Sequence, residues 1–297
     1  MSLLARLPAV RGRYTEKAPL APTTWFRVGG AAEILFKPAD LEDLQQFLAN
    51  CPTDIPVLPI GVASNLLIRD GGVEGVVIRL GGGFAGIDVQ GTQITAGAAA
   101  LDANVALSAQ LAGLAGLEFL TGVPGTIGGG LRMNAGCYGR EIKDVLVSAQ
   151  AVDRQGQLHE LCLDDMHFTY RHCGVDESWI FTSAILKGTP DTVEAVAARM
   201  VEIQKKREES QPIRTRTGGS TFANPDGARA WELIDKAGCR GLTLGGAQIS
   251  EKHCNFLINT GNSTAADLEN LGEQVKKRVK ETSGIDLRWE IKRIGKP

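Results

Sequence analysis

The sequence predicts an α+β protein in which short strands and helices follow one another without a regular βαβ order. Three observations support this prediction. Residues 87–96 show the alternation and central turn of a β-hairpin, and helical periodicity appears in several separate segments. The glycine-rich stretch 81–86 formally matches G-x-G-x-x-G, yet a hairpin follows where a dinucleotide-binding unit requires a helix. We therefore reject a Rossmann fold.

The first part of the chain, residues 1–80, alternates extended and helical signals. Residues 32–37 and 76–80 are predicted to form strands. Between them, Asp40 is placed to cap a helix. The apolar face of this helix is formed by Leu41, Leu44, Phe47 and Leu48.

The remaining two parts cover residues 81–195 and 196–297. In the first of these, an Ala-rich helix follows the hairpin. This helix covers residues 102–114, and later strands are predicted at residues 145–152, 157–163 and 179–186. The last part contains helices, each with a recognisable start or stop signal. The first covers residues 191–209 and ends before Pro212. The second covers residues 228–237 and stops at Gly238. The third begins with the Thr264 and Asp267 capping box and runs to Gly284.

Composition and charge argue against several classes of partner. The 297 residues carry a formal net charge of -2 with the two signs interspersed, which argues against nucleic-acid or membrane-surface binding and favours small molecules. Six cysteines occur without a Cys-x-x-Cys pair or metal-ligand spacing, so we expect neither a disulfide framework nor a metal site. The N-terminus lacks the apolar run of a signal peptide, and no later run is long enough to span a bilayer. We expect a cytoplasmic protein.

Two glycine-rich stretches are candidates for contacts to a phosphate or a planar cofactor. Residues 60–67 place small and short polar side chains between apolar flanks, and residues 121–130 are dense in glycine and carry no charge. Without a Cβ, backbone N–H groups can approach a ligand closely, although either stretch alone is equally well explained as a loop. Neither contains Gly-Lys-Ser/Thr, which argues against a nucleoside triphosphatase.

Ser220 is a candidate functional hydroxyl. Gly218 and Gly219 free the backbone before it, and Phe222 shields it on the other side. Such a hydroxyl can be presented to a bound ligand as a proton donor. On spacing alone, a turn that leads into a strand explains the same residues more simply.

Seven segments, taken in their order along the chain, resemble the UDP-N-acetylenolpyruvoylglucosamine reductase family of peptidoglycan synthesis. They are TWFRVGG (24–30), SNLL (64–67), GVPGTIGG (122–129), FTYR (168–171), GSTFANP (219–225), SEKHCNF (250–256) and LRWEI (287–291). Together they cover nearly the whole chain. Seven ordered segments are far more specific than any one of them.

The resemblance implies both fold and cofactors. The fold would be the FAD-binding fold of the vanillyl-alcohol oxidase and p-cresol methylhydroxylase type. Residues 1–80 and 81–195 would form its two sub-domains, and residues 196–297 a C-terminal α+β substrate-binding domain whose last strand can return to the FAD domain. The family reduces UDP-N-acetylglucosamine enolpyruvate to UDP-N-acetylmuramate with NADPH and FAD. We expect a monomer.

The resemblance also implies catalytic roles for three residues. Hydride addition to the enolpyruvyl methylene carbon pushes negative charge onto the neighbouring carbon and its carboxylate. Arg171 and Glu290 would flank this carboxylate, and Ser220 would donate the proton. A guanidinium offers a fixed fork of donors for a carboxylate, whereas a glutamate beside an anion must be protonated or share a bridging proton.

The remaining assignments are ligand contacts. The expected cofactor-binding residues are Gly61, Ser64, Asn65, Gly122, Pro124, Gly125, Thr126, Gly128, Gly129, Asn134, Ala135 and Gly136. The expected substrate-binding residues are Tyr170, Arg214 and Asn224. The chain departs from the family pattern at Val62 and Ala63, where glycine-type residues are usual. It also carries Ala223 where lysine is common, so we expect no diphosphate contact there.

Two other functions stay open. A different FAD-dependent oxidoreductase of the same fold, such as a hydroxy-acid oxidase, needs a base that is usually histidine, and none of the four histidines lies in a glycine-rich stretch. A non-catalytic nucleotide-binding module would be recognised by the loss of Ser220, Arg171 or Glu290. All three are present.

Overall fold

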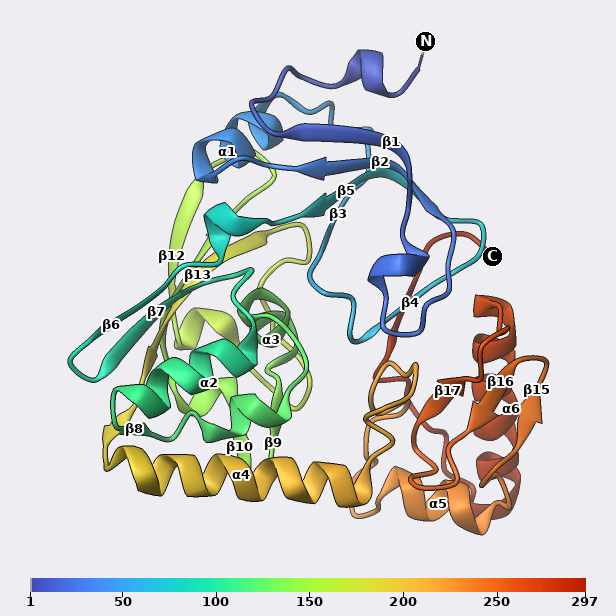
Figure 1. Cartoon of the computed structure of the whole chain (residues 1–297). Coiled ribbons are helices and arrows are strands. Elements are labelled where there is room, and N and C mark those ends of the chain that lie inside the picture. The colour runs from blue at the N-terminus through green and yellow to red at the C-terminus, as the bar shows by residue number, and fades with distance from the viewer. Residues whose placement is uncertain (1) are drawn as a thin grey trace. The chain divides into compact units, whose positions relative to one another are not determined.

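The structure, a computed structural model, describes residues 2–297, and the chain folds as two compact units (Figure 1). The first unit is built from the N-terminal residues up to Glu16, Ile34–Gly61 and Gly75–Lys206. The second is built from Lys17–Glu33, Val62–Glu74 and Arg207–Pro297. The chain passes repeatedly from one unit to the other. The three-part division expected from the sequence stays a prediction.

Helices and strands alternate along the chain. The helices are α1 (Leu41–Asn50), α2 (Asp102–Leu111), α3 (Ile127–Met133), α4 (Val193–Ser210), α5 (Ala230–Lys236) and α6 (Ala265–Ser283). The strands are β1 (Arg13–Pro19), β2 (Ala31–Lys37), β3 (Val57–Ile60), β4 (Leu66–Ile68), β5 (Val73–Arg79), β6 (Ile87–Gln90), β7 (Gln93–Gly97), β8 (Leu114–Ala115), β9 (Gly136–Cys137), β10 (Arg140–Glu141), β11 (Leu146–Val152), β12 (Leu158–Cys162), β13 (Ile180–Lys187), β14 (Thr189–Pro190), β15 (Thr243–Leu244), β16 (Ala247–Ile249), β17 (Leu257–Asn259) and β18 (Lys292–Ile294).

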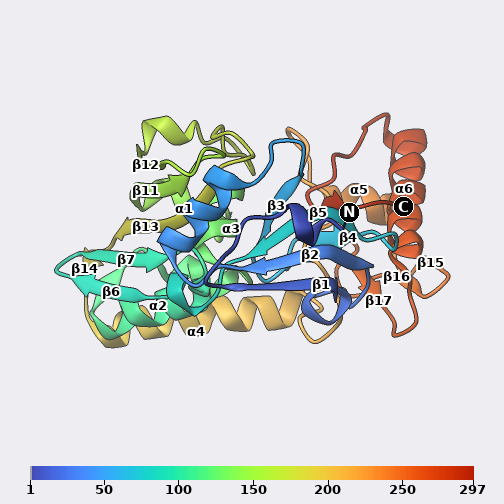
Figure 2. The same ribbon diagram turned by 90° about the horizontal axis from the view of Figure 1, so that it is seen from above.

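A five-stranded antiparallel sheet of order β12-β11-β13-β7-β6 forms the centre of the first unit. The predicted hairpin is confirmed: Gln90 pairs with Gln93, and Gly91 takes the positive φ of +59° that its tight turn requires. Helices α2 and α3 pack against β7 and neighbouring strands (Figure 2). The core between them is apolar and fully buried, with Ile94, Leu131 and Leu186 at its centre.

Helix α1 covers a second core of the first unit. Its predicted N-cap is confirmed, because Asp40 Oδ1 accepts a hydrogen bond of 3.0 Å from the N–H of Asp43. Leu44, Phe47 and Leu48 are buried, as their helical spacing predicts. Strands β3 and β5 lie in parallel beneath this core, within a sheet of order β1-β2-β5-β3.

The second unit contains the antiparallel sheet β15-β16-β17, the parallel pair β4 and β18, and helices α5 and α6. The predicted capping box of α6 is confirmed by reciprocal hydrogen bonds of 3.0 Å between Thr264 and Asp267. Gly284 ends the helix at a φ of +74°, and Gly238 follows α5 at +65°. None of the helices between residues 2 and 297 has the length and apolar composition needed to cross a membrane.

Several helices differ from the sequence prediction by a few residues at their ends, and the ends of α2 and α4 have an identifiable local cause. Helix α2 stops at Leu111 instead of continuing to Leu114, because Gly113 adopts a positive φ of +64° and Leu114 enters β8. Helix α4 begins at Val193, just after Thr192, whose hydroxyl accepts a hydrogen bond of 3.2 Å from the N–H of Ala195.

Candidate active site

The start of the first predicted glycine-rich stretch, Ile60 and Gly61, meets the second stretch within the first unit. Gly61 is exposed, and a β-carbon added to it would lie 2.8 Å from the Oγ1 of Thr126. The loop before α3 is held in place by the loop after β7, because Gly128 N–H donates to the carbonyl of Ala98 (2.9 Å) and Ile127 N–H to that of Ala100 (3.0 Å). Residues more than sixty positions apart in the sequence thus form one glycine-lined surface.

This surface suits FAD. The N–H groups of Gly125, Thr126 and Gly129 have no hydrogen-bond partner among residues 2–297. Gly129 is exposed, and a β-carbon there would meet nothing closer than the Oγ1 of Thr126 at 3.8 Å. Free backbone N–H groups in a loop of small, uncharged residues can donate hydrogen bonds to a phosphate, and a planar ring can approach them closely. The residues present therefore fit the predicted cofactor, with Pro124 in the same loop.

Two other predicted cofactor glycines are required by packing. A β-carbon on Gly122 would come within 2.6 Å of Cys137 Sγ, and one on Gly136 would collide with the carbonyl of Arg140 in the β9-β10 pair. Ala135, between α3 and β9, donates its N–H to the carbonyl of Gly130 (2.9 Å). Contacts of these three residues with a cofactor stay predictions.

Asn134 connects α3 to the segment that carries Arg171. It ends α3 with a positive φ of +41°, and its side chain is completely buried. The amide donates to Glu141 Oε2 (2.9 Å) and to the carbonyl of Thr169 (3.1 Å), and it accepts from the N–H of Lys143 (3.1 Å). Both amide protons thus bond to the protein, so any cofactor contact that needs a side-chain donor is excluded.

Arg171 lies at the tip of a tight turn. Thr169 and His172 exchange backbone hydrogen bonds of 3.1 and 3.2 Å, and Arg171 takes a positive φ of +56°. Its Nη2 donates to the carbonyl of Gly136 (2.8 Å), and its guanidinium lies 5.1 Å from the centre of the Tyr170 ring. Tyr170 itself is exposed. The turn therefore presents a guanidinium and a phenol together.

In the second unit, Ser220 follows two glycines, one constrained by its surroundings and one by its conformation. Gly219 takes a positive φ of +81°, and a β-carbon on Gly218 would collide with the ring of Phe26. Both glycines are thus needed for the backbone path. Phe222 is buried, whereas Ser220 is partly exposed. The hydroxyl lies on irregular backbone anchored by a buried aromatic ring.

The second unit brings Ser220 and Glu290 onto adjacent backbone segments. Glu290 N–H donates to the carbonyl of Thr221, the residue after Ser220 (2.9 Å). The carbonyl of Glu290 accepts a hydrogen bond of 3.1 Å from Nδ2 of Asn65. The backbone carbonyl of Asn65 accepts a hydrogen bond from the N–H of Lys292 (3.0 Å), at the point where β4 and β18 begin to run in parallel. Asn65, a predicted cofactor residue, therefore holds the backbone of Glu290, a predicted catalytic residue, through its side-chain amide. Ser64, which precedes Asn65, is partly exposed.

The predicted substrate residues of this unit are exposed. Asn224 caps α5, because its Oδ1 accepts from the N–H of Ala230 (3.0 Å), which leaves its Nδ2 for a ligand. Arg214 has no ion-pair partner within residues 2–297. Three residues before Ser220, the hydroxyl of Thr217 is buried and has no hydrogen-bond partner in this part of the chain. Ala223 is buried.

Comparison with known proteins decides the family. Residues 32–161 match the profile of an FAD binding domain, and residues 211–294 match that of the UDP-N-acetylenolpyruvoylglucosamine reductase C-terminal domain. The chain is 63% identical over 294 residues to the UDP-N-acetylenolpyruvoylglucosamine reductase of Parvibaculum lavamentivorans, covering 99% of this chain and 95% of the relative. The chain belongs to the UDP-N-acetylenolpyruvoylglucosamine reductase family.

Further relatives agree with this conclusion. The reductase of Paramagnetospirillum magneticum is 65% identical over 97% of this chain and 94% of its own length. The crystal structure of the reductase from Thermus caldophilus superposes with a TM-score of 0.84 at 33% identity, covering 97% of this chain and all of that one. The predicted family, the α+β FAD-binding fold and the assignment as an FAD-dependent oxidoreductase are confirmed.

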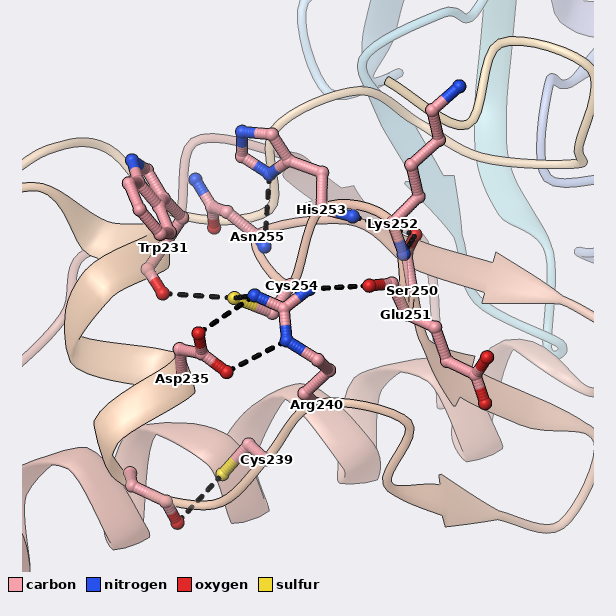
Figure 3. A network of polar contacts seen from close by, with 11 residues as sticks. Trp231, Asp235, Cys239, Arg240, Ser250, Glu251, Lys252, His253, Cys254 and Asn255 are labelled. Atoms are coloured by element: carbon pink, nitrogen blue, oxygen red, sulfur yellow. Dashed lines mark hydrogen bonds and ion pairs between the residues drawn. The ribbon is translucent and has the colours of Figure 1, made fainter. Parts of the chain in front are cut away.

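The family segment SEKHCNF (250–256) has side chains that form hydrogen bonds within the protein (Figure 3). His253 Nδ1 accepts from the N–H of Asn255 (3.3 Å), and burial lowers the pKa of this imidazole. Cys254 Sγ donates to the carbonyl of Trp231 (2.9 Å), and burial raises the pKa of its thiol. Both groups are therefore neutral and bonded to the protein at neutral pH, so they form no nucleophile pair. Within residues 2–297, no three His, Cys, Asp or Glu side chains gather as a metal site.

Proposed function

We propose that this member of the family reduces UDP-N-acetylglucosamine enolpyruvate to UDP-N-acetylmuramate with NADPH, in peptidoglycan biosynthesis. The main support is the hydrogen bond from the N–H of Glu290 to the carbonyl of Thr221, because Thr221 directly follows Ser220, the predicted proton donor. The identity to reductases of this name over nearly the full length adds to it.

The reaction saturates one carbon–carbon double bond and leaves the ether bond intact. FAD, which the glycine-lined surface of Gly61, Gly125 and Gly129 would hold, would supply the two-electron redox chemistry that connects NADPH to the substrate. A hydride adds to the methylene carbon of the enolpyruvyl group, and the electron pair of the double bond moves toward the carbon that bears the carboxylate. Ser220 donates its proton to that carbon, which completes the lactyl ether, and solvent returns a proton to the serine.

Charge stabilisation falls to two side chains. A serine hydroxyl is a weak acid, so it protonates carbon only if the anion is strongly basic and water is kept away. Glu290 would stabilise the developing charge on the carboxylate through a shared proton. Arg171 is assigned to the same carboxylate by its position in the family segment, and its guanidinium offers the matching pair of donors.

The experiment is an absorbance titration of the purified protein. We expect a yellow protein that loses its flavin absorbance on addition of NADPH without air and regains it when UDP-N-acetylglucosamine enolpyruvate is added. In heavy water, one deuterium should appear on the carbon next to the carboxylate. Recovery of colour only with oxygen would instead favour an oxidase and refute the proposal.

A further inference from the structure

The backbone around Ser220 is held by few contacts. Thr221 N–H donates to the carbonyl of Asn255 (2.8 Å), and on the other side Glu290 N–H donates to the carbonyl of Thr221 (2.9 Å). Only isolated bridges join this segment to its neighbours, and Ala223 N–H donates to the carbonyl of Arg288 (2.9 Å). The N–H and carbonyl of Phe222, between Thr221 and Ala223, take part in none of these backbone bonds and depend on a side chain.

One side chain supplies the pairing that a strand neighbour would otherwise give. Asn255 Oδ1 accepts from the N–H of Phe222 (3.0 Å), and its Nδ2 donates to the carbonyl of the same residue (2.8 Å). Asn255 is 4% exposed and Phe222 is 1% exposed, so water does not compete for these groups. A carboxamide carries the same donor and acceptor as a peptide group, which makes Asn255 a replacement for a missing strand.

Asn255 is itself fixed by the loop that precedes it (Figure 3). Its N–H donates to Nδ1 of His253, and the hydroxyl of Ser250 accepts from the N–H groups of Lys252 and His253 at 3.2 Å each. The clamp on Phe222 therefore rests on a loop with its own internal hydrogen bonds.

We propose that Asn255 is a positioning residue that holds the hydroxyl of Ser220 against the substrate carbon. The inference rests on the proposed function, in which this hydroxyl donates the proton. Misplacing a reacting group by 1 Å lowers a rate by as much as about 10²-fold. Because Asn255 fixes the residue two positions after Ser220, and Glu290 pairs with the residue between them, its loss should disturb the proton donor in particular.

The test separates the two halves of the catalytic cycle in Asn255→Ala. We expect the rate of flavin reduction by NADPH to stay within about 2-fold of the parent, while reoxidation by UDP-N-acetylglucosamine enolpyruvate slows by about 10- to 100-fold. Equal slowing of both halves, or a parent-like reoxidation rate, would overturn the proposal. If the parent protein itself is not reoxidised by this compound, the proposed function fails, and the two failures are thereby distinguished.

Asn259 provides a matched control. It is buried in the same unit, and its side chain also ties backbone: Nδ2 donates to the carbonyl of Phe26 (2.7 Å), and Oδ1 accepts from the N–H groups of Gly261 (2.8 Å) and Ser263 (3.2 Å). Asn259→Ala should lower the thermal midpoint as much as Asn255→Ala does, but without selective loss of the reoxidation half. The same selectivity in Asn259→Ala would assign the effect to general loosening of the unit and reject Asn255 as a positioning residue.

A double variant tests whether Asn255 acts through Ser220. If it does, Ser220→Ala/Asn255→Ala should reoxidise no more slowly than Ser220→Ala alone, whereas multiplied effects would show an independent role. Should Asn255→Ala fail to fold, Asn255→Asp keeps the acceptor for Phe222 N–H and sets a carboxylate oxygen, in place of the donor, against the carbonyl of Phe222. Its reoxidation should then lie between those of the parent and Ser220→Ala, and an unchanged rate would reject the proposal.

Discussion

Replacing Asp102 by asparagine should stabilise the protein, and the gain should increase as the pH rises. Asp102 is the first residue of α2, and its side chain is completely buried in the first unit. Neither carboxyl oxygen has a hydrogen-bond partner within residues 2–297. Burial therefore raises the pKa of this carboxyl well above its ordinary value.

The sign and size of the effect follow from proton linkage. Asp102 holds its proton in the folded state at pH values where the unfolded chain has released it. Its stabilising contribution is fully present below the unfolded pKa of about 3.9 and is lost as the pH rises through the folded pKa. Within this window, each pH unit lowers the free energy of unfolding by about 1.4 kcal/mol. Stabilisation of an anion by the first turn of α2 contributes up to about 1 kcal/mol, which is less than the change over a single pH unit of this slope.

Urea unfolding of the parent and of Asp102→Asn between about pH 5 and pH 8 measures this difference. Asp43 supplies the contrast, because it is equally buried but accepts hydrogen bonds from the N–H groups of Arg11 (2.7 Å), Gly12 (2.9 Å) and Ala39 (2.9 Å). Asp43→Asn should therefore lower stability by about 1–3 kcal/mol, since it replaces an acceptor by a donor. A difference between the parent and Asp102→Asn that stays constant over the pH range would show that the buried carboxyl is not held protonated, and the reasoning would fail.

Three further substitutions test the candidate active site. Ser220→Ala should leave flavin reduction by NADPH nearly unchanged and slow turnover by about 10²- to 10⁴-fold; stopped-flow traces with both half-reactions equally slowed would remove the serine from proton transfer. Glu290→Gln should lower kcat more than it changes KM, because its effect is on the charged intermediate, and steady-state kinetics with only KM raised would contradict this role. Asn134→Ala frees the turn that carries Arg171, so KM for the enolpyruvyl substrate should rise several-fold; a KM equal to that of the parent would exclude this support.

Signals between residues close in the sequence predicted local structure well. The hairpin at Gly91 and the capping box of Thr264 and Asp267 depend on neighbours within a few positions, and the structure confirms them. The end of α2 was predicted too late, because the alanine-rich composition outweighed the stop signal of Gly113. Local propensity thus identified the elements better than their ends.

Contacts between distant segments could not be predicted in the same way. Asn65 was assigned to the cofactor because it lies in a loop of small residues, yet its amide donates to the carbonyl of Glu290, 225 positions away. Asp102 begins the predicted helix 102–114, and only the structure shows that its carboxyl is buried without a hydrogen-bond partner among residues 2–297. In both cases the chemistry of the side chain was clear from the sequence, but its partner was not.

Three asparagines, two of them in the family segments, share one physical role. Asn65, Asn134 and Asn255 each donate an amide proton to a backbone carbonyl of a segment that carries or adjoins a predicted catalytic residue. Ser220 and Arg171 lie on irregular backbone. Such backbone leaves peptide groups without ladder partners, and buried groups of this kind cost about 1–3 kcal/mol each when unpaired. A carboxamide satisfies them without adding charge. An asparagine in such a segment is therefore as consistent with holding the backbone as with contacting a ligand. Kinetic measurements distinguish the two roles: loss of a ligand contact weakens binding, whereas loss of a backbone contact slows the step that needs the residue it holds.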